Sequence, residues 1–272
     1  MTKGWWVILL ALISFGLAPQ TVHASVQRQV PTLYLHGHHG GPNSMVPLMT
    51  AAQRTDHATA VVTATVDGDG HVHLEGDWPV ATHRPLIKIV FKNNRTLNYH
   101  RIADWLRNVI EKLQSRYQIT KFNIVAHSLG NAAVLFYELR YGDVPGLPKL
   151  QRYVAIAANF NGVPGVHHLR RQHHLGPDGR PPWFAPDFRR ALRMRRHFPV
   201  NQVDVLNIYG NIGDGTYWDG KVLNVSSRSL KYLLGRRLRT YRTLPIYGPQ
   251  AQHSLLRYNL EVAGATNHFL WP

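Results

Sequence analysis

The sequence predicts one α/β domain built around a mostly parallel β-sheet with helices on both faces. Short apolar runs with strand character alternate with amphipathic stretches of helical spacing along nearly the whole chain. The length of 272 residues and the hydrophobic content of 44% suit a single large core and argue against extensive disorder. Neither an internal repeat nor an interdomain linker interrupts the alternation.

The expected elements follow in a regular order along the chain. Strands are expected at residues 31–35, 60–66, 71–74, 85–91, 122–126, 153–158, 203–209 and 239–246. Helices are expected at residues 45–54, 98–117, 132–139, 226–234 and 256–262. The second of these helices carries Ile102, Leu106, Ile110 and Leu113 at three- and four-residue spacing. Because it leads directly into the next strand, the two form one crossover unit.

The turn Asp67-Gly68-Asp69-Gly70 joins two of the expected strands. Asp-Gly between alternating residues predicts a β-hairpin. The same letters are similar to part of an EF-hand calcium loop. With Asp67 as the first ligand, however, the twelfth position holds Trp78 where a bidentate Glu is needed. We therefore expect a hairpin.

The N-terminus predicts export from the cell. Lys3 precedes an apolar core at residues 5–13, which is short for a membrane span, and Val22-His23-Ala24 supplies a small-residue cleavage pattern. We expect a signal peptide at residues 1–24, cleaved after Ala24, with a retained N-terminal anchor as the alternative. The domain then occupies residues 25–272. The chain has no cysteine, so its stability must come from the core rather than from disulfides.

The charge balance is strongly basic. Lys and Arg number 31 against 15 Asp and Glu, which gives a net charge of +16. Such a charge predicts attraction to polyanions, and for a secreted bacterial protein the anionic cell envelope is the expected partner. No arginine-rich motif or basic stripe with interleaved aromatic residues indicates specific nucleic-acid binding. The sequence gives no signal for an oligomeric state.

Residues from about 163 to 201 differ in character from the rest of the chain. Prolines are frequent, apolar runs are short, and basic pairs are concentrated at His167-His168, Arg170-Arg171, His173-His174, Arg189-Arg190 and Arg195-Arg196-His197. We expect a solvated, basic, cap-like insertion over the sheet. The histidine pairs suggest a metal site, but adjacent side chains point in different directions and no carboxylate has ligand spacing. No metal is therefore expected.

The turn that carries Ser128 is the strongest sign of chemistry. An apolar run at 124–126 predicts a buried strand, and His-Ser-Leu-Gly separates it from the expected helix. Strand, tight turn with serine, and helix are the context of a nucleophile elbow. Its small flanking positions are Ala126 and Gly130, so one methyl group is added where glycine is usual. A serine that only caps the helix would look the same in this stretch alone.

A serine nucleophile needs a base and an acid that orients the base. In a sheet of this type they follow in the order Ser, Asp or Glu, His, each in a loop after a strand. The loop after the seventh expected strand holds Asp214 and Asp219, and the loop after the eighth holds His253. These grounds leave both acids open. His268 competes with His253, but it lies in an apolar tail that suggests packing.

Two backbone N–H groups are expected to form an oxyanion hole. One belongs to Leu129, directly after the serine at the start of a helix. The other belongs to His38, in the loop after the first strand. We expect the side chains of the neighbouring His36 and His127 to be structural.

These residues resemble a family of secreted or cell-surface α/β-hydrolases of Gram-positive bacteria, grouped as a family of unknown function and distantly similar to lipases and esterases. The resemblance covers residues 30–271. It rests on Leu35-His36-Gly37, the hairpin at 67–74, Asn98-Tyr99-His100, the elbow at 125–131, Asn159-Phe160-Asn161-Gly162, Asp219-Gly220 with Val222, Ser226-Ser227, and Gln252-His253-Ser254.

The resemblance implies the alpha/beta-hydrolase fold, with Ser128, Asp219 and His253 as a catalytic triad. In this family a Ser-Asp-Gly-x-Val element usually carries the acid. The chain matches it with Asp219-Gly220-Lys221-Val222, except that Trp218 replaces the serine. This favours Asp219 and keeps Asp214 as the alternative. Substrate preference is not implied, since the basic insertion is unusual.

The expected function is that of a secreted serine hydrolase that cleaves carboxylic esters of small molecules or lipids, without a metal or organic cofactor. Two alternatives use the same residues differently. One is a peptidase or amidase with the same triad. The other is a non-catalytic surface protein that keeps the fold and binds an anionic envelope polymer through its basic cap.

Overall fold

The computed structural model of the 272-residue chain describes residues 1–2, 29–163 and 174–272. The expected signal peptide, apart from its first two residues, lies outside the described residues, as do His167, His168 and His173 of the expected basic insertion. None of the helices in the described ranges is long and apolar enough to cross a membrane.

An eight-stranded sheet runs through the domain in the order β3-β2-β4-β1-β5-β6-β7-β8. Neighbouring strands are parallel except for the β2–β3 hairpin, which confirms the prediction of a mostly parallel sheet and of a hairpin at Asp67–Gly70. The strands are β1 (Thr32–Leu35), β2 (Thr59–Val66), β3 (Val72–Gly76), β4 (Pro85–Phe91), β5 (Lys121–His127), β6 (Lys149–Ile156), β7 (Asp204–Asn211) and β8 (Thr240–Tyr247).

The strand order changes direction at β1. The chain leaves β1 toward β2 and β4 on one side, and then returns to place β5 on the other side. Leu35 at the end of β1 pairs with Ala126 near the end of β5, so the loops that follow these two strands lie side by side. In open parallel sheets, such a reversal leaves a crevice at the carboxyl ends of the strands, where ligands bind.

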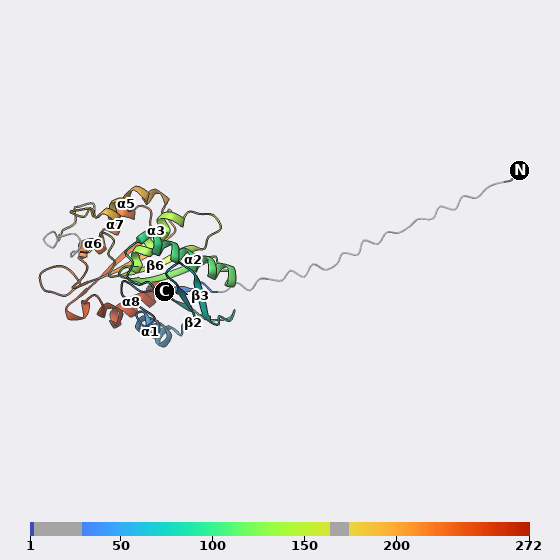
Figure 1. Ribbon diagram of the computed structural model, residues 1–272, viewed down its shortest axis with the longest axis horizontal. Helices are drawn as coiled ribbons and strands as arrows, with labels where there is room; N and C mark the ends of the chain where they lie inside the picture. Colours follow the sequence, from blue (N-terminus) through green and yellow to red (C-terminus); the bar gives the residue numbers. More distant parts are fainter. Residues whose placement is uncertain (3–28, 164–173) are drawn as a thin grey trace.

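Helices cover both faces of the sheet, as predicted (Figure 1). Helices α1 (Val46–Asp56) and α8 (Leu260–Leu270) bury their apolar residues with one core cluster. Helices α2 (Tyr99–Tyr117), α3 (Gly130–Tyr141), α5 (Pro186–Met194) and α7 (Leu230–Leu234) pack into the cluster on the opposite face. Successive strand residues point to opposite faces, so Ile124 of β5 belongs to the second cluster and Val125 to the first.

Helix α2 forms where the apolar spacing predicts it. Asn98 caps the helix, because its side-chain oxygen accepts a hydrogen bond from the N–H of Arg101 at 3.0 Å. All four residues of the predicted apolar stripe are buried, namely Ile102, Leu106, Ile110 and Leu113. The helix ends at Gln118, which adopts a left-handed conformation.

Two helix predictions need correction. The helix predicted at 256–262 is wrong in its bounds: a 3-10 turn spans Leu255–Arg257, and α8 begins only after Asn259, whose side chain caps it by accepting from the N–H groups of Glu261 and Val262. The single helix predicted at 226–234 is divided into α6 (Asn224–Arg228) and α7. At the break, the hydroxyl of Ser229 donates to the carbonyl of Ser226 and so competes with the helical pattern.

The described part of the expected basic insertion contains helix α5. Its three arginines, Arg189, Arg190 and Arg193, are exposed, in line with the expectation of a solvated basic surface. The opposite face was not anticipated: Phe188 and Ala191 are fully buried in the core cluster that also contains α3. The short apolar runs of this region therefore form one amphipathic helix that is fixed to the domain.

Candidate active site

The turn between β5 and α3 holds Ser128 in a strained conformation. Its φ angle is 53°, in the left-handed region that non-glycine residues rarely adopt. Its N–H donates to the carbonyl of Ile156 at 2.9 Å, which continues the β5–β6 pairing into the turn. The serine side chain consequently stands at the carboxyl end of the sheet and borders a pocket.

Two glycines make room for this turn. A Cβ atom on Gly37, in the loop after β1, would lie 2.7 Å from the Cβ atom of Ser128. A Cβ atom on Gly130 would lie 2.7 Å from the carbonyl oxygen of His36. Because real Cβ atoms do not approach other atoms so closely, the loop after β1 and the turn after β5 can meet only with glycine at both positions.

A buried polar network supports the turn from below. The side-chain amide of Asn131 donates to the carbonyl oxygens of Ser128 and Ile156, both at 3.0 Å. Its oxygen accepts from the hydroxyl of Tyr153 at 2.8 Å, and Asn131 is fully buried. Sequence reasoning did not assign a role to Asn131 or Tyr153. An amide directly after the Ser-x-Gly turn, at the start of an apolar helix, is the signal that could have identified the first of them.

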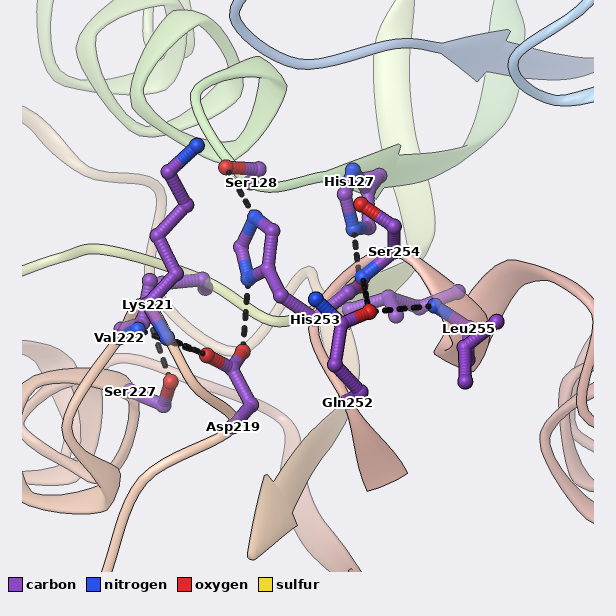
Figure 2. Close-up of polar contacts among 12 residues, drawn as sticks. His127, Ser128, Asp219, Lys221, Val222, Ser227, Gln252, His253, Ser254 and Leu255 are labelled. Atoms are coloured by element: carbon purple, nitrogen blue, oxygen red, sulfur yellow. Dashed lines mark hydrogen bonds and ion pairs between the residues drawn. The ribbon is translucent and has the colours of Figure 1, made fainter. Parts of the chain in front are cut away.

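His253 and Asp219 meet Ser128 above this turn (Figure 2). Nδ1 of His253 lies 2.7 Å from Oδ2 of Asp219 and donates to it. Nε2 is then left as the acceptor for the hydroxyl of Ser128, whose Oγ is 2.9 Å away. Three residues that are distant in the sequence, from the loops after β5, β7 and β8, are thus joined by two consecutive hydrogen bonds.

The Asp219 carboxylate is buried and fully hydrogen bonded. Its second oxygen, Oδ1, accepts from the N–H groups of Lys221 at 2.8 Å and Val222 at 2.7 Å (Figure 2). The residue is only 1% exposed, so its carboxylate loses its hydrating water on folding. These hydrogen bonds take the place of that water. The backbone N–H of His253 also donates to the carbonyl of Asp219 at 2.7 Å, which holds the two loops together.

The competing residues lie elsewhere. Asp214 is exposed, and its carboxylate accepts from the side chains of Thr216 and Trp218 rather than from His253. His268 lies on an exposed position of α8. The geometry therefore brings Asp219 and His253, and neither of their competitors, to Ser128.

The two neighbouring histidines bind backbone groups, as expected of structural residues. His127 donates from Nε2 to the carbonyl of His253 at 2.9 Å, and burial lowers its pKa well below the usual value, with the charges of His253 and Arg257 acting in the same direction. His36 accepts from the N–H of Phe91 at 3.0 Å, and burial also lowers its pKa. Both rings are therefore neutral, and His127 fixes the backbone of His253.

Two backbone N–H groups remain available beside Ser128. Within residues 29–163 and 174–272, neither the N–H of Leu129 nor that of His38 has a hydrogen-bond acceptor, and both residues line the pocket. Leu129 is the N-cap residue of α3, where the helix dipole favours negative charge. A pair of free N–H groups next to a serine hydroxyl suits an oxygen atom that becomes anionic.

The pocket has a volume of about 520 Å³, which is the size of a small-molecule site. Ser128 and His253 line it beside Gly37 and His38 of the β1 loop. The lining also includes Leu97 and Tyr99 at the start of α2, Asn159 and Val163 after β6, and Pro186 at the start of α5. In the described part of the chain, no three His, Asp or Glu side chains are grouped so that they could hold a metal ion.

A family model described as "Alpha/beta hydrolase of unknown function (DUF915)" matches residues 19–272. Among solved structures, the product of gene lin2722 from Listeria innocua has a TM-score of 0.80 and 25% identity, over 89% of this chain and 94% of that one. "The putative cell surface hydrolase from Lactobacillus plantarum WCFS1" has a TM-score of 0.70 and 21% identity, over 89% of both chains. No curated protein matches the sequence.

A more distant likeness is the carboxylesterase CesB from Bacillus subtilis, with a TM-score of 0.50 and 13% identity, over 90% of this chain and 86% of that one. At such low identity it shows the fold alone. Together with the family match, these structures confirm the predicted alpha/beta-hydrolase fold and the resemblance to cell-surface hydrolases of Gram-positive bacteria.

Proposed function

Since the chain belongs to the family of alpha/beta hydrolases of unknown function, we propose that it is a serine hydrolase that cleaves carboxylic esters. The observation that carries this proposal is the continuous hydrogen-bonded chain from Asp219 through His253 to Ser128, at the edge of a pocket. Each of the three residues is of the type that acyl transfer to serine requires, and the hydrogen bonds join them in the required order.

In the first half of the reaction, Oγ of Ser128 attacks the carbonyl carbon of the ester while Nε2 of His253 takes the hydroxyl proton. Asp219 keeps the ring in the correct orientation and stabilises it while it is charged. The carbonyl oxygen becomes an oxyanion, which the N–H groups of Leu129 and His38 bind. The bond to the alcohol oxygen then breaks, and His253 gives its proton to the leaving alcohol.

In the second half, water attacks the acyl group on Ser128. His253 takes a proton from this water, and an oxyanion forms again at the same two N–H groups. When the bond between the acyl carbon and Oγ breaks, His253 returns the proton to Ser128 and the carboxylic acid leaves. The groups of the chain suffice for every proton transfer, so the proposed reaction needs no cofactor.

The proposal is tested with a series of p-nitrophenyl esters of increasing acyl length. The purified protein should hydrolyse some member of the series, and Ser128→Ala and His253→Ala should each reduce kcat by about 10⁴-fold or more, with only a small residual rate from the oxyanion hole and substrate binding. The matching p-nitroanilides separate an esterase from an amidase. Equal rates for the protein and for folded Ser128→Ala on all esters and anilides would contradict the proposal.

A fluorophosphonate probe tests the nucleophile without a choice of substrate. It should label the protein on Ser128 and leave Ser128→Ala unlabelled, with circular dichroism to establish that the variant is folded. A folded protein that neither reacts with the probe nor hydrolyses any ester would instead be a binding protein on a hydrolase fold.

We also propose that the protein is exported and acts at the cell surface. The apolar N-terminal stretch with its small-residue pattern supports export, and the similar Lactobacillus plantarum protein is named a cell surface hydrolase. N-terminal sequencing of the protein from the producing cells is expected to begin at Ser25. A protein that keeps Met1 and fractionates with membranes would point to a retained anchor instead.

A further inference from the structure

Arg257 enters the pocket from the 3-10 turn Leu255–Arg257, close after His253 in the sequence. Its Nη1 donates at 2.8 Å to the carbonyl of Ser44, a lining residue that lies just before the start of α1. Its Nε is buried and has no hydrogen-bond partner within the described residues. The guanidinium also lies over the ring of Tyr258, at 5.8 Å from its centre. These contacts fix the side chain but leave most of its donors unused.

No carboxylate neutralises this guanidinium. All 15 Asp and Glu residues of the chain lie within the described ranges, and residues 3–28 and 164–173 contain neither type. No ion pair joins any of these carboxylates to Arg257. A partly buried charge without a counter-ion is costly, and proteins retain such charges mainly where a ligand completes them.

The charge of Arg257 acts on the catalytic end of the pocket. It lowers the pKa of His36 and of His127, although burial has the larger effect on both. These histidines flank Gly37 and Ser128, respectively. Burial likewise lowers the pKa of Arg257 itself, which remains a cation at neutral pH. An anion bound at Arg257 would share the pocket with Ser128, since both residues line it.

Lys221 adds a second unpaired cation to the same pocket. It directly follows the Asp219-Gly220 turn, and Figure 2 shows its side chain extending from that turn alongside the ring of His253. Among the described carboxylates none forms an ion pair with it. The neighbouring His39 stacks on His38 with ring centres 4.1 Å apart, and its pKa is lowered first by His38 and also by Lys221.

The carboxylate that lines the pocket differs from these cations, because it is paired. Among the described residues, Asp187 of α5 is the one carboxylate that lines it, and Arg190 pairs with Asp187 at 3.0 Å. The negative charge in the pocket lining is therefore neutralised by the protein, whereas the positive charges of Arg257 and Lys221 are not. The overall basic composition does not explain this pattern, because a composition effect would place unpaired arginines on the exposed surface.

We propose that the natural substrate is an ester that carries an anionic group, a carboxylate or a phosphate, and that Arg257 binds this group with Lys221 at the rim. The proposal rests on the proposed esterase function and specifies its substrate class. It makes Arg257 a specificity-determining residue. The anion would bind the Nη groups of Arg257, since the buried Nε is out of its reach, and would hold the ester in the pocket that Ser128 lines.

The test compares matched esters that differ only by the charge. Mono-p-nitrophenyl adipate and p-nitrophenyl hexanoate place a carboxylate or a methyl group at the end of the same six-carbon acyl chain. The anion 4-butanoyloxybenzoate and its methyl ester place the difference in the alcohol part. In one of these pairs, kcat/KM should favour the anionic member by about tenfold or more, since two nearby cations are engaged.

Three variants assign that preference. Arg257→Gln should reduce kcat/KM for the anionic ester about tenfold more than for its neutral counterpart, Arg257→Lys should retain part of the preference, and Lys221→Gln should have a smaller effect of the same sign. Arg54→Gln removes one positive charge from an exposed position on α1 and should leave the preference unchanged. Equal losses for charged and neutral esters in Arg257→Gln would overturn the proposal, as would a neutral preference in both pairs of the parent protein.

Binding without turnover separates this inference from the esterase proposal. Calorimetry with adipate and with inorganic phosphate on Ser128→Ala should show binding of at least one anion, lost in Ser128→Ala with Arg257→Gln. The anion that binds more tightly indicates a carboxylate or a phosphate substrate. Neutral ester hydrolysis that depends on Ser128, together with no binding of either anion, would leave the esterase intact and overturn the anionic substrate. Binding that depends on Arg257 without any ester hydrolysis would overturn the esterase alone.

Discussion

The carboxylate of Asp219 and the guanidinium of Arg257 differ in how far the fold supplies their hydrogen-bond partners. Asp219, behind His253, accepts three hydrogen bonds and is almost completely buried. Arg257, which lines the pocket, donates one hydrogen bond to a backbone carbonyl and has no counter-ion in the described structure. The Asp219 carboxylate has its hydrogen-bond donors without any ligand, whereas Arg257 keeps donors without an acceptor in the described structure. This difference matches the two proposed roles, catalysis for Asp219 and substrate selection for Arg257.

The sharpest test of the first half of this comparison uses two acids from one loop. Asp219→Asn should lower kcat for ester hydrolysis by a factor on the order of 10⁴, because an amide favours the wrong tautomer of His253. Asp214→Asn is the matched control and should change kcat by less than about threefold, since Asp214 binds only Thr216 and Trp218 in an exposed turn. Comparable losses in the two variants would mean that the acid has been assigned to the wrong carboxylate.

The supports of the serine turn should be costly to remove. Asn131→Leu leaves the buried hydroxyl of Tyr153 without its acceptor and removes one of the two hydrogen bonds that each of the carbonyls of Ser128 and Ile156 accepts. We expect the free energy of unfolding to fall by about 2–4 kcal/mol, measured by urea denaturation. Tyr153→Phe removes only one of these bonds and should cost about 1 kcal/mol. If the two variants were equally stable, the amide would contribute little beyond its bond to Tyr153.

Helix α3 contains a second buried polar residue that has no such partners. Glu138 is 1% exposed, and neither of its carboxylate oxygens has a hydrogen-bond partner in the described structure. Burial raises its pKa to about 8, so the folded protein keeps this carboxyl protonated at neutral pH. In the unfolded chain the same group ionises near its ordinary pKa of 4.5. Between these two values the folded state binds one proton more than the unfolded state.

Stability should therefore fall as the pH rises from about 4.5 to about 8, by at most about 1.4 kcal/mol per pH unit for this one group. Glu138→Gln has no ionisable group at this position, so its free energy of unfolding should not show this fall. Its stability relative to the parent protein should therefore improve steadily between pH 5 and pH 8. Urea denaturation at both pH values measures the change, with the exposed Glu75→Gln as the control. A stability difference that stays constant with pH would show that Glu138 does not carry the proton in the folded state.

The sequence predicted the fold and the central residues because both leave local signals. Apolar runs set the strands, the apolar stripe of α2 set that helix, and the turn at Ser128 has a recognisable strand–serine–helix context. The choice between Asp214 and Asp219 needed the resemblance to a family, since both follow the same strand. Contacts between distant segments left no local signal: Arg257 is held by Ser44, 213 positions away in the sequence.

The same limit explains the helix that was placed wrongly. The apolar residues after His253 predict one short helix at 256–262, whereas in the structure Asn259 caps the later and longer helix α8. The cap is visible in the sequence only once the path of the chain is known, because asparagine is equally at home in a loop. Charge balance at the pocket was likewise invisible, since it depends on which side chains face one another.

The smallest expected effect concerns His127, which acts on the reaction only through its neighbour. It donates to the carbonyl of His253 and its ring lies 4.8 Å from that of His253, without contact to the serine hydroxyl. His127→Phe should lower kcat about tenfold, because the base loses one of the bonds that fix its backbone. KM should change less than kcat, because His127 is one of many residues that line the pocket and the others are retained.

Rescue distinguishes this positioning role from simple packing. His127→Gln retains an N–H donor of suitable reach and should recover much of the kcat lost in His127→Phe, although the two variants replace the same buried ring. Stability measured by urea denaturation controls for packing. If kcat followed stability in both variants, or if KM rose while kcat stayed constant, His127 would be a core residue only. A recovered kcat would instead show that the hydrogen bonds that position the catalytic base include His127 at the end of β5, besides Asp219. Arg257 and Lys221 would then remain the groups proposed to bind the substrate.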